Sequence, residues 1–226
     1  MNPEFWHNRW QEKRIGFNQS EVNPLLKKYW SALNLPIGSR VFVPLCGKSI
    51  DMVWLLSQGY DVVGVELVES AVQEFFAEQN IEPTVHQHLE NPTIKCYQGK
   101  LEDNGRSITL WVADIFALTA KDIGNINAVY DKAALIALPA DMRQEYSEQV
   151  RQLSINKSNQ AAAQFLLTLN YDQSKKDGPP FSISHEQLQQ YYGSHYEITE
   201  LASEPASIGS MPELTVTEHV GLLNSQ

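Results

Sequence analysis

The chain has 226 residues, of which 42% are hydrophobic and 10% aromatic, so it can bury a sizeable core and fits one large α/β domain, residues 1–226. Its formal net charge of −10 opposes binding to nucleic-acid backbones and to anionic membranes, because like charges repel. Cys46 and Cys96 form no disulfide framework, and the sequence has neither a signal-peptide apolar region nor a membrane-spanning apolar run. We therefore expect a cytoplasmic protein without a nucleic-acid or membrane partner, and we further expect it to be a monomer.

Two predicted helices, residues 3–14 and 22–33, precede the first strand. Trp6 and Trp10 lie four residues apart in the first of them and so share one helical face. Taken alone, this pair predicts a stripe that packs against the core.

Residues 40–66 are the most informative part of the chain. An apolar strand at 41–43 runs into a turn at Leu45-Cys46-Gly47, and a second strand at 62–65 ends on Glu66. The helix expected between them has apolar residues at i, i+3 and i+4 spacing, namely Ile50, Val53 and Trp54. This order is typical of a mononucleotide-binding unit, in which a carboxylate about 20 residues beyond the turn accepts hydrogen bonds from ribose hydroxyls.

Three ligands fit such a unit in principle. A dinucleotide such as NAD favours G-x-G-x-x-G, but Gly47 is the only glycine in this turn. A P-loop ends in Gly-Lys-Ser, as residues 47–49 do, yet its first glycine would fall on Phe42. S-adenosylmethionine carries a ribose and an adenine but no phosphate, and it fits these residues best.

Strands and helices alternate through the rest of the chain. Predicted strands are 94–98, 108–113, 127–131, 162–170, 196–201 and 214–222, with a turn at 103–105 and a loop at 202–213. Predicted helices are one opened by an S-x-x-Q capping box at Ser70, with a buried side of Val72, Phe75 and Phe76, then 141–153, and 184–192 with a second such box. The alternation predicts a mostly parallel sheet covered by helices on both faces.

Several segments resemble the bacterial thiopurine S-methyltransferase family: FWHNRW at 5–10, GFNQ at 16–19, VPLCGKSIDMVWL at 43–55, GVEL at 64–67, YDKAALIALP at 130–139 and GPPFSIS at 178–184. The resemblance covers the whole chain in order. It implies a Rossmann-like class I methyltransferase domain with a seven-stranded, mostly parallel sheet and an N-terminal helical lid at 1–35. It also implies S-adenosylmethionine as methyl donor, S-adenosylhomocysteine as product, and sulfur, selenium or tellurium compounds as acceptors.

The resemblance also implies site residues. The family's cofactor contacts fall on Trp10, Leu45, Glu66 and Lys132, and the adenine position falls on Ile115 and the backbone of Asp114. Gly47 belongs to the same turn. An aspartate that ends a strand, as Asp114 does, also caps the following turn in many proteins, and both roles stay open here.

Other residues are candidates for the acceptor. Phe17 matches a family position that lines the acceptor pocket, and Phe181, after Pro179 and Pro180, is expected near the same opening. Asp131 follows the fourth core strand and is a candidate to orient a protonated acceptor. Lys132 replaces the family's usual arginine; it keeps the charge but lacks the planar fork that makes bidentate contacts.

Two features limit the acceptor assignment. No lysine or arginine occurs from Asp177 to Gln226, so an anionic acceptor finds no compensating charge in this part of the sequence. The histidines lack metal-ligand spacing, and we expect no metal. The alternatives are a methyltransferase of the same fold acting on halide, thiocyanate or another acceptor, an NAD-dependent oxidoreductase, and a non-catalytic protein that binds an adenosyl ligand.

Overall fold

The structure is a computed structural model that describes residues 3–156, 158–209 and 211–226. Met1 and Asn2, within the predicted lid, and Ser210, within the predicted loop at 202–213, lie outside the described residues. The strands are β1 (Arg40–Val43), β2 (Asp61–Glu66), β3 (Thr84–Gln87), β4 (Lys95–Lys100), β5 (Ser107–Val112), β6 (Ala128–Lys132), β7 (Ala163–Asn170), β8 (Tyr196–Ile208) and β9 (Met211–Ser225). The α-helices are α1 (Pro3–Gln11), α2 (Pro24–Tyr29), α3 (Asp51–Ser57), α4 (Glu69–Glu78), α5 (Ala120–Ile123), α6 (Ala140–Leu153) and α7 (His185–Tyr192). Short 3-10 helices are η1 (Trp30–Leu33), η2 (Ile115–Ala117), η3 (Leu135–Ala137) and η4 (Gln173–Lys175).

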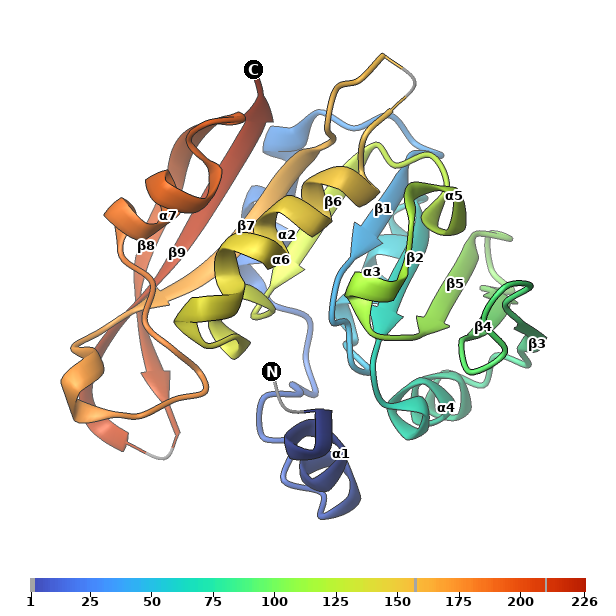
Figure 1. The fold of residues 1–226 in the computed structure, drawn as a ribbon, viewed down its shortest axis with the longest axis horizontal. Coiled ribbons are helices and arrows are strands. Elements are labelled where there is room, and N and C mark those ends of the chain that lie inside the picture. The colour runs from blue at the N-terminus through green and yellow to red at the C-terminus, as the bar shows by residue number, and fades with distance from the viewer. Residues whose placement is uncertain (1–2, 157, 210) are drawn as a thin grey trace.

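In the described part of the chain the strands form one sheet in the order β3-β4-β5-β2-β1-β6-β7-β9-β8 (Figure 1). Strands β5, β2, β1, β6 and β7 are parallel, and β9 is antiparallel to both of its neighbours. The predicted α/β fold with a mostly parallel sheet is confirmed, but the sheet has nine strands rather than seven. The predicted hairpin strand β4 and the unpredicted β3 extend the sheet beyond β5. All four side chains of β3 are exposed, so this strand lacks the apolar alternation by which a strand is recognised.

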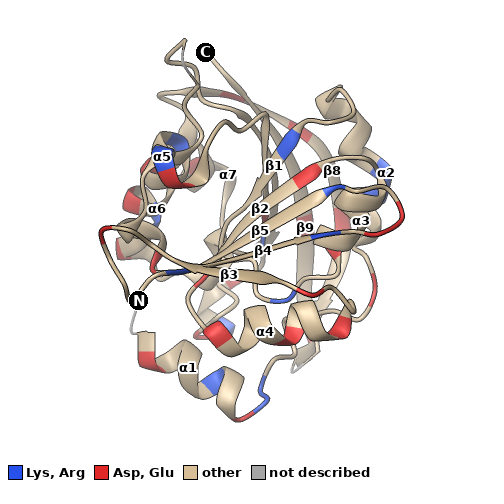
Figure 2. Cartoon of the chain, turned by 90° about the vertical axis from the view of Figure 1, so that its right-hand side faces the viewer, with Lys and Arg blue, Asp and Glu red and all other residues tan. Residues whose placement is uncertain are grey.

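Helices cover both faces of the sheet, and the strand residues alternate between the two layers. Phe42 points into the core beneath α5, α6 and α7, whereas Val41 and Val43 point into the core beneath α2, α3 and α4. Figure 2 shows the sheet nearly edge-on, with α5 and α6 on one side and α2 and α3 on the other. The two-layered core fixes the ends of the parallel strands, where the candidate site lies.

The helices lie close to their predicted positions in the chain, but some of their N-caps and buried sides differ from the prediction. The capping box at Ser184 is present at the start of α7. Helix α4 buries Val72 and its neighbours as predicted, but it begins at Glu69 after an N-cap at Val68, not at Ser70. Helix α3 buries Met52, Leu55 and Leu56 completely and leaves the predicted side of Ile50, Val53 and Trp54 only half-buried. Asp51 also lies on the buried side of this helix, and its carboxylate accepts a hydrogen bond from the Tyr130 hydroxyl.

The C-terminal hairpin is longer than the sequence indicates. Pairing of β8 with β9 runs from Tyr196 opposite Ser225 to Ile208 opposite Met211, so most of the predicted loop at 202–213 is strand. Ile208 packs in a small cluster with Tyr171, Leu214 and Val216. The tip of this hairpin lies at the carboxyl end of the parallel strands, where residues 205–209 border a cavity.

Candidate active site

A cavity of about 1080 Å³ opens at the carboxyl ends of the parallel strands. It is bordered by α1, by the turns after β1, β2, β5 and β6, and by the tip of the β8–β9 hairpin. Strand β1 lies between β2 and β6, so the chain reverses its strand order here, at the place where open α/β sheets bind ligands. Figure 1 shows α1 beyond the carboxyl ends of the strands, where it covers one side of this region.

The turn after β1 has a backbone that few residues adopt. Leu45 has φ +46° and Gly47 has φ +53°, and both line the cavity. The left-handed conformation suits glycine but costs a residue such as leucine free energy, of order 1–3 kcal/mol, so the surrounding structure must enforce it at Leu45. Cys46 N donates to Val65 O at 2.9 Å, which ties this turn to β2. The fold therefore holds the Leu45–Gly47 turn against β2 and at the edge of the cavity.

Glu66, the last residue of β2, binds the turn after β1 through its carboxylate. Its Oε2 accepts a hydrogen bond from Gly47 N at 2.9 Å, and its Oε1 accepts one from Val68 N at 2.8 Å. Burial raises the pKa of Glu66 to about 6, although these backbone amides act in the opposite direction. The Leu67 amide acts on the same carboxylate, which offers about four lone-pair sites in all, and Glu66 is part of the cavity lining.

Helix α1 brings aromatic side chains over this turn. Trp10 is only 3% exposed and lines the cavity, and a Cβ placed on Gly47 would lie 3.3 Å from Trp10 Cζ2. The ring of Phe17 meets those of Trp6 and Trp10 edge-on, at centroid distances of 5.5 and 5.7 Å. Phe17 is 38% exposed and also lines the cavity. The structure thus brings both predicted residues, Trp10 and Phe17, to one wall of the cavity.

The segment after β5 forms another wall. Asp114 and Ile115 both line the cavity, with Ile115 buried and Asp114 exposed. Asp114 Oδ1 accepts a hydrogen bond from Phe116 N at 3.1 Å and so caps η2. The structure shows the capping role of Asp114, and its place on the cavity wall is compatible with the predicted adenine contact.

Lys132 belongs to a buried network that the sequence did not reveal. Its Nζ lies 3.2 Å from Oδ2 of Asp51, an aspartate with no exposed surface. Tyr130 donates its hydroxyl to the same oxygen at 2.9 Å, and Asn23 N donates to Asp51 Oδ1 at 2.8 Å. Glu218, whose pKa is raised by burial, also lines the cavity here. Asp51 occupies the first position of a helix, where an acidic residue is common, so its role had no distinctive signal.

Asp131 is placed differently from the expectation. Its side chain is fully buried: Oδ2 accepts a hydrogen bond from the Tyr146 hydroxyl at 2.7 Å, and Oδ1 accepts one from Ala134 N at 3.2 Å. Burial raises the pKa of Asp131 to about 6. The described cavity lining contains its neighbours Tyr130 and Lys132 but not Asp131. Its carboxylate holds the turn after β6, in which Ala133 has φ +64°.

Residues 178–181, which include the predicted acceptor contact Phe181, line two different pockets. Gly178, Pro179 and Pro180 line the cavity, as does the hairpin tip from Pro205 to Gly209. Phe181 instead lines a separate pocket on α6 and lies against Arg143. The structure therefore brings Pro179 and Pro180, but not Phe181, to the cavity with Phe17.

The basic residues that line the cavity come from segments that precede Asp177 in the chain. Among the described lining residues these are Arg9 from α1, Lys132 at the end of β6, and Lys176 before the Gly178 turn. Lys132 is paired with Asp51, and Lys176 Nζ donates to Pro179 O at 3.3 Å. The sequence stretch from Asp177 onward carries no basic residue, but the folded site is not devoid of positive charge.

Within the described residues, no cluster of three or more metal-ligating side chains is found. In the same part of the chain, no helix combines the length and the hydropathy that crossing a membrane requires.

Comparisons with solved structures support the fold. The chain resembles 1,6-didemethyltoxoflavin-N1-methyltransferase of Burkholderia thailandensis, solved with S-adenosylhomocysteine and its substrate, with a TM-score of 0.63 and 13% identity over 99% of this chain and 87% of that one. It equally resembles an S-adenosylmethionine-dependent methyltransferase of Methanosarcina mazei, with a TM-score of 0.63 and 12% identity over 91% of this chain and 99% of that one.

Sequence comparisons are more specific. The family described as "Thiopurine S-methyltransferase (TPMT)" matches residues 1–216. Thiopurine S-methyltransferase of Psychrobacter cryohalolentis is 63% identical over 99% of both chains, and that of Teredinibacter turnerae is 45% identical over 99% of this chain and 98% of its own. With its class I sheet and its cavity at the strand-order reversal, the chain belongs to the thiopurine S-methyltransferase family of S-adenosylmethionine-dependent enzymes.

Proposed function

We propose that this enzyme methylates the sulfur of small aromatic or heterocyclic thiols, of which thiopurines are the type, and that it also accepts selenium or tellurium compounds. The observation that carries the proposal is one cavity with two different walls. A buried carboxylate and a strained backbone turn form one wall, and the rings of Trp6, Trp10 and Phe17 form another. Its volume of about 1080 Å³ is slightly above the usual ~300–1,000 Å³ for one ligand, which leaves room for cofactor and acceptor together.

We assign the cofactor to the Glu66 wall. The free lone pairs of the Glu66 carboxylate would accept hydrogen bonds from the two ribose hydroxyls, while Leu45 and Gly47 bring backbone close to the ligand. Asp114 and Ile115 would border the adenine, and Trp10 would cover the cofactor. We place Lys132 in the same set, held in position by its pairing with Asp51.

The acceptor would lie between Phe17 and the Gly178–Pro180 turn. The partly exposed ring of Phe17 would stack on a planar heterocycle on the side away from Arg9, whose Cζ lies 5.9 Å from the ring centroid. Arg9 and Lys176 supply positive charge near this position, which favours a thiolate or another anionic acceptor. Asp131, whose oxygens are occupied by Tyr146 and backbone amides, would act as a positioning residue for the turn after β6.

When bound, S-adenosylmethionine supplies a methyl group already activated on a sulfonium. The protein's task is then to hold the acceptor in line with that methyl group, and positioning of this kind supplies up to ~7–11 kcal/mol in the best intramolecular cases. An acidic thiol arrives as thiolate near neutral pH, so the proposal needs no dedicated base. The whole chain would act as one domain, in which the N-terminal segment at 1–35 closes over the site and excludes water.

A methyl-release assay tests this function. Aromatic thiols should be methylated faster than halide or thiocyanate, with selenite and tellurite included in the panel. Preference for halide or thiocyanate would assign the enzyme to the alternative acceptor class. No release from any acceptor, with S-adenosylmethionine bound, would indicate a non-catalytic adenosyl-ligand protein. NADH binding in equilibrium dialysis, in place of S-adenosylmethionine, would contradict the cofactor assignment.

We further propose that the enzyme works in the cytosol as a monomer, without a nucleic-acid or membrane partner. The net charge of −10 opposes binding to nucleic acids and anionic membranes, and two free, buried cysteines fit a reducing compartment. Sedimentation at several protein concentrations tests the monomer, and a concentration-dependent dimer would contradict it.

A further inference from the structure

A second pocket lies on the other side of the segment that borders the acceptor end of the cavity. Its volume is about 530 Å³, and it sits between the amino-terminal ends of α6 and α7. Apart from Ala140 and Phe181, the described side chains that line it are polar or charged, namely Arg143, Asn170, Tyr171, Gln173, Asp177, Ser182, Ser184 and Gln187. Gly178–Pro180 face the large cavity, whereas Phe181 and Ser182 face this pocket.

Arg143, which lines this pocket, is a buried arginine without a counterion among the described residues. Its side chain is only 3% exposed, yet only Nε has a hydrogen-bond acceptor, the Leu138 carbonyl at 2.9 Å. Within the described residues, no hydrogen bond or ion pair joins Nη1 or Nη2 to another group. Neither atom is among the fully buried polar atoms that lack a partner, so Arg143 meets the pocket through a small accessible surface. Phe181 covers the guanidinium, whose Cζ lies 5.3 Å from the ring centroid.

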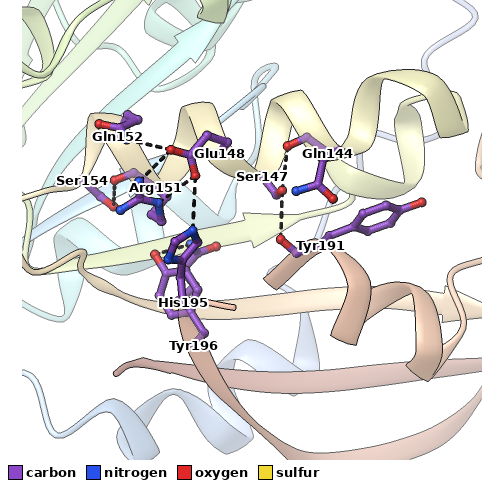
Figure 3. Close-up of polar contacts among 10 residues, drawn as sticks. Gln144, Ser147, Glu148, Arg151, Gln152, Ser154, Tyr191, His195 and Tyr196 are labelled. Atoms are coloured by element: carbon purple, nitrogen blue, oxygen red, sulfur yellow. Dashed lines mark hydrogen bonds and ion pairs between the residues drawn. The ribbon is translucent and has the colours of Figure 1, made fainter. Parts of the chain in front are cut away.

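Arg151, on the same helix, shows how a satisfied arginine looks. Its Nε and Nη2 donate to the two carboxylate oxygens of Glu148, at 2.7 and 2.6 Å (Figure 3). This arginine is more exposed than Arg143 and still has a counterion. A buried guanidinium without one is costly, because desolvation of the charge is not offset by pairing.

We propose that this pocket binds a small oxyanion, a carboxylate or a phosphate, through Nη1 and Nη2 of Arg143. The planar fork of a guanidinium matches two oxygens of such a group, and the paired geometry gives strong, charge-assisted hydrogen bonds. The amino end of α6 borders the pocket as well, but Asp141 in its first turn offsets the positive end of this helix, so the proposal rests on the guanidinium alone. Asp177 on the lining repels a second negative charge, which favours a carboxylate over a phosphate dianion.

NMR titration of the full-length, isotope-labelled protein tests the site. Acetate and inorganic phosphate serve as separate probes, with ionic strength held constant by sodium chloride. The signals followed are the Arg143 side-chain Nε–H and the backbone amides of Phe181 and Ser182. Arg143→Met removes the fork, and Arg151→Gln is the matched control, because it removes an arginine from the same helix away from the pocket.

The proposal expects saturable shifts of these signals in the wild type and in Arg151→Gln, and their loss in Arg143→Met. Stronger saturation by acetate than by phosphate is expected from Asp177. Absence of saturable shifts in the wild type, or their persistence in Arg143→Met, would overturn the proposal. Should circular dichroism show Arg143→Met unfolded, Arg143→Lys keeps the charge and stem but not the fork, and binding as tight as in the wild type would overturn it equally.

Discussion

Glu66 gives the sharpest prediction: cofactor affinity should rise as the pH rises through about 6, and this rise should vanish in Glu66→Gln. Burial raises the pKa of Glu66 from 4.5 to about 6 in the protein without cofactor. In the proposed complex the ribose hydroxyls donate hydrogen bonds to the carboxylate, which favours its ionised form. Binding therefore releases a proton from those molecules in which Glu66 is protonated.

The size of the effect follows from the ionised fraction. With a pKa of about 6, roughly a tenth of the molecules are ionised near pH 5 and roughly nine-tenths near pH 7, so affinity should fall about tenfold between them. The stability of the cofactor-free protein should depend on pH in the opposite direction from the cofactor affinity. Between the unfolded pKa of 4.5 and the folded pKa of about 6, the folded chain binds more protons than the unfolded chain. The free energy of unfolding of the cofactor-free protein should therefore decrease as the pH rises through this window, by about 2 kcal/mol from this residue.

Calorimetry with S-adenosylhomocysteine near pH 5 and pH 7 measures the affinity, and two buffers of different ionisation enthalpy count the protons released. Asp131→Asn is the matched control, because Asp131 is a buried carboxylate with a pKa also near 6 that does not line the cavity. It should keep the pH dependence. A wild-type affinity that is constant over this range would refute the reasoning, as would Glu66→Gln binding as tightly as the wild type at neutral pH.

The remaining predictions concern the elements around Glu66. Gly47→Ala should cost roughly 1–2 kcal/mol of stability and weaken cofactor binding, because φ is +53° and the new Cβ would lie 3.3 Å from Trp10; an unchanged melting temperature would contradict this. Deletion of residues 1–19 should abolish turnover while circular dichroism still shows the folded sheet, and full activity would remove the lid from the proposal. Asp51→Asn should destabilise the protein by about 3–5 kcal/mol in urea unfolding, because it leaves Lys132 without its buried partner; a loss near zero would show that the pair is dispensable.

The sequence by itself determined the unit at residues 40–66. An apolar run, a turn with one glycine, an amphipathic stretch and a second apolar run ending on Glu66 are local patterns, and each depends on residues close in the chain. The same holds for the capping box at Ser184, whose two partners lie within one helical turn. The long family motifs extended these patterns to the whole fold.

Only the tertiary structure decided where side chains at sharp turns point. Asp131 and Lys132 are adjacent in sequence, yet one carboxylate turns inward to Tyr146 while the lysine lines the cavity beside Asp51. Phe181 turns away from the cavity that its neighbour Pro180 lines. The buried side of α3, which includes the charged Asp51, likewise differs from the side that the apolar pattern predicted. These directions depend on burial, hydrogen bonds and charges supplied by distant segments, and no short-range pattern of residue types contains that information.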